Sequence, residues 1–365
     1  MGSARPACGP TRCPASSTRR RGPRRRSRPE PAGGAGNRRA KRLDRLPGSN
    51  QDGTRPGKQA SPVPQTSDPV PSPIRSVLVT GGSGNLGGKL VRHLIAAPWC
   101  QAIVSLDVPG QEAPEAGHPK VTAVAVDLAD PADTRWREAL AGVDAVVHLA
   151  AQNPYPDAPW PDAAASMDMT LNLLAAAQAT GLRRFVFASS NHVMGQYKDE
   201  PLAGTIGPGR LTPELAPGPG TRWFDGQRMV QGVAYGVSKL VGERACVAAA
   251  AATGGRLTAV AVRIGWCQPG ENRPETLNAA GLPGAPPRTD PDAERDLRWF
   301  RGMWLSNRDY AHLMERALVA APDGWPAPGI VVNGMSANGG MAWSLEATRR
   351  HLGYAPQDDI AREPA

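Results

Sequence analysis

Short apolar runs alternate with helical stretches along most of the chain, and this alternation restricts the fold more than any other feature. Predicted strands occupy 76–80, 101–110 and 121–130, and helix-then-strand units occupy 136–153, 167–195 and 235–270. The strands are apolar on both faces, which is typical of a parallel sheet covered by helices on both sides. The pattern predicts an α/β fold with a Rossmann-like, doubly wound parallel sheet.

The C-terminal part extends this pattern. Residues 306–321 predict a helix with Ser306 as N-cap, because the side chain of a serine there can accept the N–H of Asp309. A last strand is expected within 329–337 and a last helix within 343–354. Two long segments rich in Gly and Pro, 196–232 and 268–300, interrupt the alternation. Both follow the C-terminal ends of strands, where open α/β sheets bind ligands.

The first 73 residues are expected to form a disordered, basic tail rich in Pro and Arg. Such a segment cannot bury enough apolar surface to offset the entropy of ordering it. Of the 42 Lys+Arg and 33 Asp+Glu, 17 and 4 fall in residues 1–75, which leaves 25 and 29 for the remainder. The body is therefore mildly acidic and carries no electrostatic footprint for nucleic acid. We interpret the tail as a dispensable extension; a nucleic-acid arm and a targeting peptide are the alternatives.

Cysteine usage and hydropathy predict the compartment. The five cysteines include no pair with metal-ligand spacing, so we expect a reduced, cytoplasmic protein without a bound metal. No apolar run reaches the ~18 residues of a membrane span. The N-terminus has arginines but no apolar stretch behind them, so it does not resemble a secretory signal.

A glycine-rich loop follows the first predicted strand and opens the first helix. Gly81, Gly84 and Gly87 lie at the spacing that permits a tight turn, close approach of a pyrophosphate, and close packing of helix on strand. Asn85 and Leu86 lie within the same loop. The free N–H groups of the helix N-terminus favour an anion. The loop therefore predicts a dinucleotide site.

Two acidic residues end the next two strands. Asp107 lies 20 residues beyond Gly87, where a carboxylate holds the adenosine ribose 2′-hydroxyl and repels a 2′-phosphate. We therefore expect NAD rather than NADP. Asp127 and Leu128 end the third strand and are expected to meet the adenine edge.

These motifs carry a resemblance to a known family. The chain resembles the extended short-chain dehydrogenase/reductase (NAD-dependent epimerase/dehydratase) family in five motifs. These are the T-G-x-x-G-x-x-G loop, "DL" after the third strand, "HLAA" at 148–151, "FASSNHVMG" at 187–195 and "YGVSK" at 235–239. The similarity runs from about Ile74 to the C-terminus. Within the family, the chain is most similar to uronate dehydrogenases in the motifs "SSNHV", "YGVSK", "VRIG-x-C-x-P" and "WLSNRDY". Those enzymes oxidise the C1 hydroxyl of a hexuronic acid to a lactone with NAD.

The resemblance implies a catalytic set. Tyr235 would be the general base, Lys239 would favour the phenolate and hold the nicotinamide ribose, and Ser190 would orient the reacting oxygen. Leu149 and Ala150 of "HLAA" would line the cofactor site. An ammonium one helical turn from a phenol favours its ionised form, which suits a general base. Family members that lack catalysis typically lose the Tyr/Lys pair.

The resemblance also implies substrate contacts. Asn191 and His192 would meet sugar oxygens, and Asn153 aligns with a substrate-contacting position. Trp266 stands where uronate dehydrogenases commonly have a small polar residue, so it would stack on an apolar sugar face or fill space.

A carboxylate on the substrate would need a cationic partner from the segment after Trp266. Arg273 is the first choice there, and Arg301 and Arg298 are alternatives.

The sequence thus predicts an NAD-dependent dehydrogenase of a sugar or sugar acid, acting at C1 of a uronate or aldose. We divide the chain into the tail (1–73), an NAD-binding domain (74–265, with an insertion at 196–232) and a small substrate-binding region (266–365). A homo-oligomer is expected. The alternatives are a nucleotide-sugar epimerase or dehydratase with tightly bound NAD, and a non-catalytic NAD-sensing module.

Overall fold

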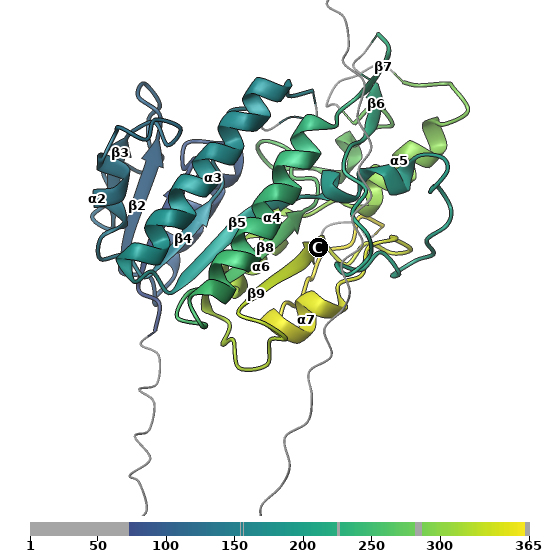
Figure 1. The fold of residues 1–365 in the computed structure, drawn as a ribbon. Helices are drawn as coiled ribbons and strands as arrows, with labels where there is room; N and C mark the ends of the chain where they lie inside the picture. Colours follow the sequence, from purple (N-terminus) through teal and green to yellow (C-terminus); the bar gives the residue numbers. More distant parts are fainter. Residues whose placement is uncertain (1–72, 154, 156, 225–226, 282–286, 362–365) are drawn as a thin grey trace, which may run out of the picture. The chain divides into compact units, whose positions relative to one another are not determined.

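A seven-stranded sheet, with all strands parallel, organises the structure. The computed structural model describes residues 73–153, 155, 157–224, 227–281 and 287–361. The strand order is β3-β2-β1-β4-β5-β8-β9, which confirms the predicted Rossmann-like α/β fold (Figure 1). The strands are β1 (Ser76–Thr80), β2 (Ala102–Asp107), β3 (Val121–Ala125), β4 (Ala145–His148), β5 (Arg184–Ser190), β8 (Thr258–Ile264) and β9 (Gly329–Gly334).

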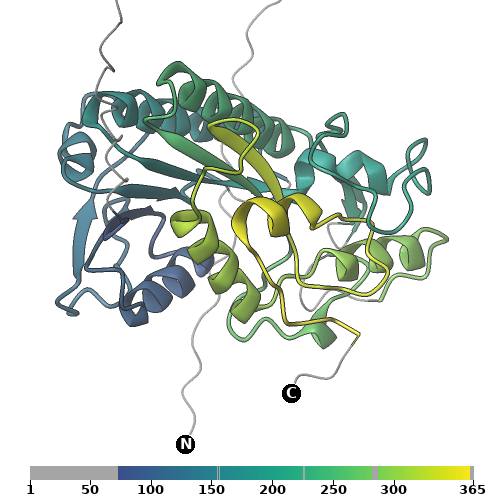
Figure 2. The ribbon, with the colours of Figure 1, turned by 90° about the horizontal axis from the view of Figure 1, so that it is seen from below.

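Helices cover both faces of this sheet, as Figure 2 shows. On one face lie α2 (Arg135–Leu140), α3 (Trp160–Thr180) and α4 (Ala234–Ala252), and on the other lie α1 (Asn85–Ala96) and α6 (Asn307–Val319). Helix α7 (Glu346–Leu352) packs beside β9. No helix among the residues with a described position is long and apolar enough to cross a membrane.

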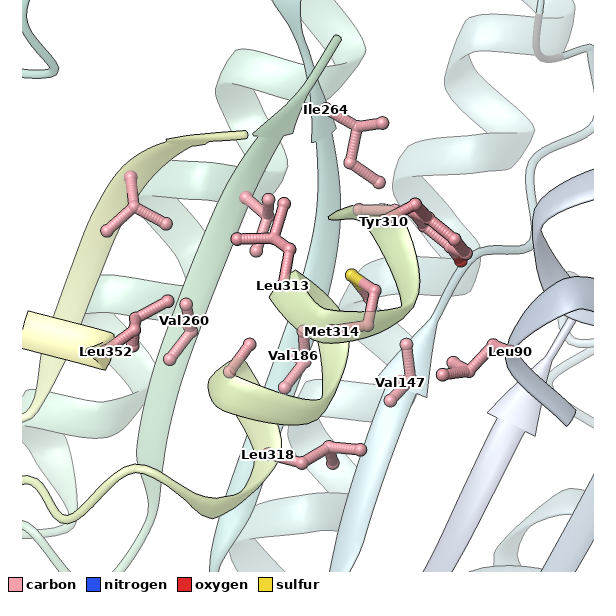
Figure 3. Packing of buried hydrophobic residues seen from close by; sticks show 14 of the residues in the cluster. Leu90, Val147, Val186, Val260, Ile264, Tyr310, Leu313, Met314, Leu318 and Leu352 are labelled. Carbon is pink, nitrogen blue, oxygen red and sulfur yellow. The ribbon is translucent and has the colours of Figure 1, made fainter. Parts of the chain in front are cut away.

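The core consists of two clusters separated by the sheet, because successive strand side chains point to opposite faces. In β1, Val77 and Val79 join the cluster under α1 and α6, while Leu78 joins the one under α2, α3 and α4. Figure 3 shows α6 lying over the strands, with Leu313 and Met314 in the first cluster. The sheet is therefore apolar on both faces, as the sequence predicted.

Helix α6 begins as predicted. The Ser306 hydroxyl accepts the N–H of Asp309 at 3.0 Å, and this N-cap satisfies one of the donors that a helix start leaves unpaired. Helix α6 therefore begins directly after Trp304 and Leu305 in the chain.

The two interrupting segments contain secondary structure and meet each other. The first continues from the 3-10 helix η1 (Asn191–Lys198) into an antiparallel pair, β6 (Arg222–Phe224) and β7 (Met229–Gln231). The second contains the 3-10 helix η2 (Pro274–Thr276) and α5 (Ala293–Gly302). The buried Lys198 ammonium lies 3.0 Å from the buried Asp296 carboxylate of α5, so an ion pair joins the two segments.

Candidate active site

The glycine loop between β1 and α1 forms a close-packed backbone cradle. Gly81 has φ +69°, and a Cβ on Gly87 would lie 2.0 Å from the Gly81 carbonyl oxygen. Any side chain at position 87 would therefore push the loop open. The loop brings its own backbone close to whatever it binds, which is the arrangement that a pyrophosphate requires.

A cavity of about 640 Å³ opens over this loop. The Asp107 carboxylate at the end of β2 accepts the Ser83 N–H at 2.7 Å, so it is fixed directly above the loop. Asp127 also faces the cavity, although its Oδ1 accepts the N–H of Ala129 at 2.9 Å. Except for Tyr235 and Lys239, the residues predicted to contact a dinucleotide all line this cavity: Gly81, Gly84, Asn85, Leu86, Gly87, Asp107, Asp127, Leu128, Leu149 and Ala150. These residues could hold a dinucleotide.

A buried hydrogen-bond chain supports one wall of the cavity. Thr80 Oγ1 accepts the N–H of Ala150 at 3.1 Å and lies 2.8 Å from His148 Nδ1. The other ring nitrogen of His148 lies 3.0 Å from Thr170 Oγ1 on α3. Burial, with a smaller contribution from the Lys239 ammonium, lowers the pKa of His148 to about 3. The imidazole is therefore neutral and positions Thr80, whose hydroxyl oxygen accepts the backbone N–H groups of Leu149 and Ala150.

A second cavity, of about 490 Å³, continues from the first. Residues that line both cavities are Asn85, Leu86, Leu149, Tyr155 and Cys267. Ser190 at the end of β5 and both Tyr235 and Lys239 on α4 line the second cavity. The structure thus brings the predicted catalytic set together, next to the predicted dinucleotide site.

The Ser190 hydroxyl is close enough to Tyr235 to affect its pKa, and its oxygen accepts the N–H of His192 at 3.2 Å. The Lys239 ammonium lies 5.6 Å from the centre of the Tyr235 ring and 5.2 Å from that of Phe187. Burial lowers the pKa of Lys239 to about 8.

The pKa of Tyr235 corrects a prediction from the sequence. Burial raises the pKa of Tyr235 above the ordinary phenol value, and the nearby Ser190 hydroxyl offsets the shift only in part. The sequence predicted a lowered value from Lys239 alone; it did not include the desolvation of a fully buried phenol, which disfavours the charged form.

The predicted substrate residues divide into two groups. Asn191, His192 and Trp266 line the second cavity. Asn153 does not: its amide lies 3.4 Å from Asp162, and its carbonyl accepts the Tyr155 N–H. Arg273 also lies away from the lining, where it forms an exposed ion pair with Glu271.

The other candidate arginines do not line the cavity either. Arg298 forms an exposed ion pair with Glu294. Arg301 does not belong to the part of the described chain that lines the cavity. The prediction that Arg273 faces the substrate is therefore not met by this structure, because the Arg273 side chain is 69% exposed and pairs with Glu271 at the surface.

Several lining residues were not predicted from the sequence. Trp223 comes from β6 of the first interrupting segment, and Phe300 and Met303 come from α5 and the residue after it. The only signal in the sequence was that both segments are long and follow the ends of strands. Nothing local identified which of their side chains turn inward.

The chain belongs to the NAD dependent epimerase/dehydratase family, whose model matches residues 77–266. It is 32% identical over 294 residues to the L-arabinose 1-dehydrogenase (NAD(P)(+)) of Haloferax volcanii, covering 78% of this chain and 97% of that one. It is 30% identical over 295 residues to the NAD-dependent glucose-6-phosphate dehydrogenase of the same organism, covering 78% and 94%.

A solved structure with the same fold is a mutant uronate dehydrogenase from Agrobacterium tumefaciens in complex with NAD. It is 27% identical, the match covers 78% of this chain and 86% of that one, and the TM-score is 0.54. The resemblance to uronate dehydrogenases is thereby confirmed, and sugar dehydrogenases are added to the relatives.

Proposed function

We propose that the protein is an NAD-dependent dehydrogenase that oxidises the C1 hydroxyl of a cyclic sugar to a lactone. The observation that carries this proposal is the position of Ser190, Tyr235 and Lys239. They line a cavity that continues into the one above the glycine loop. Relatives named as sugar and uronate dehydrogenases support the same class of reaction.

The proposed cofactor is NAD. The cradle at Gly87 fits a pyrophosphate, and Asp107 fits a ribose 2′-hydroxyl while repelling a 2′-phosphate. When bound, NAD supplies the hydride acceptor. The residues from 74 to 265 would bind it, and the region 266–365 together with the insertion 196–232 would complete the substrate side.

The proposed proton transfer uses Ser190 and Tyr235, which both line the second cavity. The sugar C1 hydroxyl would lie between their side-chain oxygens, with Ser190 orienting it. Tyr235 in its phenolate form takes the hydroxyl proton, while the C1–H bond breaks and its electron pair leaves as hydride. A lactone and NADH result. Lys239 favours the phenolate, opposing the effect of burial.

The alternatives differ in what is released. An epimerase would keep its NAD bound and release no NADH, and an NAD-sensing module would turn over nothing. The retained Tyr235–Lys239 pair favours catalysis over sensing.

Replacing Tyr235 tests the proposal. Tyr235→Phe removes only the proton acceptor, so we expect NADH formation with an aldose to fall about 100- to 10,000-fold, with NAD affinity nearly unchanged. Tyr197→Phe is the matched control, because the Tyr197 hydroxyl bonds the Ala216 carbonyl at 2.9 Å outside the cavity lining. Activity of Tyr235→Phe within threefold of wild type would refute the assignment.

A further inference from the structure

The second cavity has an aromatic and apolar wall. The Trp266 and Phe300 rings meet edge to face, with centroids 5.1 Å apart and planes at 81°. Gly281, at φ +71°, lies so close that a Cβ there would be 3.0 Å from both rings. Trp223 and Met303 line the same cavity. Three chain segments thus converge to present ring faces and edges rather than charges.

Apart from Lys239, the polar side chains of this lining carry no charge near pH 7, and several are hydrogen-bonded within the protein, although the Trp223 indole N–H has no partner among the described residues. His192 Nδ1 lies 2.8 Å from Thr221 Oγ1, and burial, with a smaller contribution from Lys198, lowers the pKa of His192 to about 4. Asn191 donates to the Ile264 carbonyl at 3.1 Å. The Gln268 amide donates to the Arg273 carbonyl at 2.9 Å. These groups suit hydroxyl partners and add no positive charge near pH 7.

Three arginines outside the cavity lining are held by carboxylates. Arg263 lies behind the lining and binds both oxygens of Glu243, at 2.8 and 2.9 Å. Arg288 and Arg295 pair with the buried Asp296. Moving the Arg263 guanidinium into the cavity would leave the buried Glu243 carboxylate without its counter-charge. Moving Arg288 or Arg295 would remove one of the three cationic partners that the described residues provide to Asp296.

Lys239 is the one Lys or Arg among the described residues that line the cavity. Lys239 lies beside Tyr235, at the end of the cavity where the proposed proton transfer from the sugar C1 hydroxyl takes place. The internal positions outside the described residues (154, 156, 225–226 and 282–286) contain no Lys, Arg or His in the sequence.

We propose that this site selects a neutral aldose, whose apolar C–H face packs against the Trp266–Phe300 wall, and discriminates against sugars that carry a carboxylate or phosphate away from C1. This rests on the proposed C1 dehydrogenase function. An anionic group away from C1 would be buried against rings and neutral polar groups, and desolvating a charge without a counter-charge is strongly disfavoured.

Galactose and galacturonate form a matched pair, because they differ only at C6, where a hydroxymethyl group replaces a carboxylate. We expect kcat/KM of the full chain with NAD to be at least about 100-fold higher for galactose. Glucose and glucose 6-phosphate provide a second pair, with the same expected order. L-Arabinose, which has no C6, is expected to stay within about tenfold of galactose.

The wall is tested by Trp266→Ala. This variant is expected to raise KM for galactose about tenfold or more and to change KM for NAD less than threefold, because the ring contacts the sugar and not the dinucleotide. Trp160→Phe serves as the control: this side chain lies 57% exposed at the start of α3 and does not line the cavity.

The outcomes separate the two proposals. Galacturonate or glucose 6-phosphate turned over as well as the neutral partner would overturn the neutral-substrate inference and leave the dehydrogenase function standing. If no sugar yields NADH, the dehydrogenase function fails. In that case binding of galactose and galacturonate to the NAD-loaded protein, measured by calorimetry, decides the inference. Tighter binding of galactose supports it; tighter binding of galacturonate, or no binding of either, refutes it.

Discussion

Replacing Glu243 by glutamine is expected to destabilise the fold strongly. The Glu243 side chain on α4 is 3% exposed and that of Arg263 on β8 is 2% exposed. Glu243 Oε1 also accepts the hydroxyl of Ser189 on β5 at 2.5 Å. Glu243→Gln keeps the volume but leaves the Arg263 guanidinium buried without its counter-charge. Removing one partner of a buried pair costs about 3–5 kcal/mol, a large part of the roughly 5–15 kcal/mol that stabilises a typical protein.

The assay is urea unfolding, with the free energy of unfolding obtained from the midpoint and slope. Glu346→Gln is the matched control, because its i,i+4 pair with Arg350 is exposed, at 73% and 64%. Such pairs contribute about 0.3–0.5 kcal/mol. We expect the two variants to differ by more than about 2 kcal/mol. Equal losses, or a loss below about 1 kcal/mol for Glu243→Gln, would contradict the reasoning.

Three further predictions concern the cofactor site and acid stability. Asp107→Ala is expected to weaken NAD binding about 10- to 100-fold, by loss of a charge-assisted hydrogen bond, and to reduce the preference for NAD over NADP. Titration calorimetry with both nucleotides checks this. A wild-type protein that already prefers NADP would show the Asp107 argument to be wrong. Gly87→Ala is expected to weaken NAD binding about tenfold or more, because the new Cβ would lie 2.0 Å from the Gly81 carbonyl oxygen. Unchanged NAD affinity in the same titration would mean that this loop does not bind the cofactor. The third concerns pH: burial lowers the pKa of His148 to about 3 and of His192 to about 4, so below about pH 6.5 the unfolded chain binds protons that the folded chain does not. The free energy of unfolding should therefore fall from pH 6.5 towards pH 4, by up to about 1.4 kcal/mol per pH unit for each histidine. Chemical unfolding across this pH range should show that the free energy of unfolding falls less steeply for His148→Asn than for wild type. An identical pH dependence in the two proteins would count against a neutral, buried His148.

The sequence predicts the cofactor side of the molecule better than the substrate side, for a physical reason. The glycine loop, Asp107 and Asp127 belong to strand ends whose positions follow from local patterns. Once the strands alternate with helices, parallel pairing places these ends at one edge of the sheet. Ser190 and Tyr235 come together in the same way, since β5 and α4 are regular elements.

The substrate side depends on irregular chain, where local pattern does not determine direction. Arg273 was expected to face the substrate because it lies near the end of β8, but its side chain is exposed and pairs with Glu271 at the surface. Trp223 lines the cavity because β6 and β7 fold back on one another, a long-range pairing that the composition of the segment does not reveal. The pKa of Tyr235 was mispredicted because burial is a property of the tertiary structure.

Transfer of deuterium tests the central claim, hydride transfer from sugar C1 to NAD, most directly. The full chain is incubated with NAD and galactose carrying deuterium at C1, and the reduced cofactor is analysed by mass spectrometry. The account predicts free NADH that carries one deuterium, formed together with galactonolactone, and no labelled NADH with Tyr235→Phe over the same period. Unlabelled NADH, or a sugar product that keeps its deuterium while NAD stays oxidised, would contradict it.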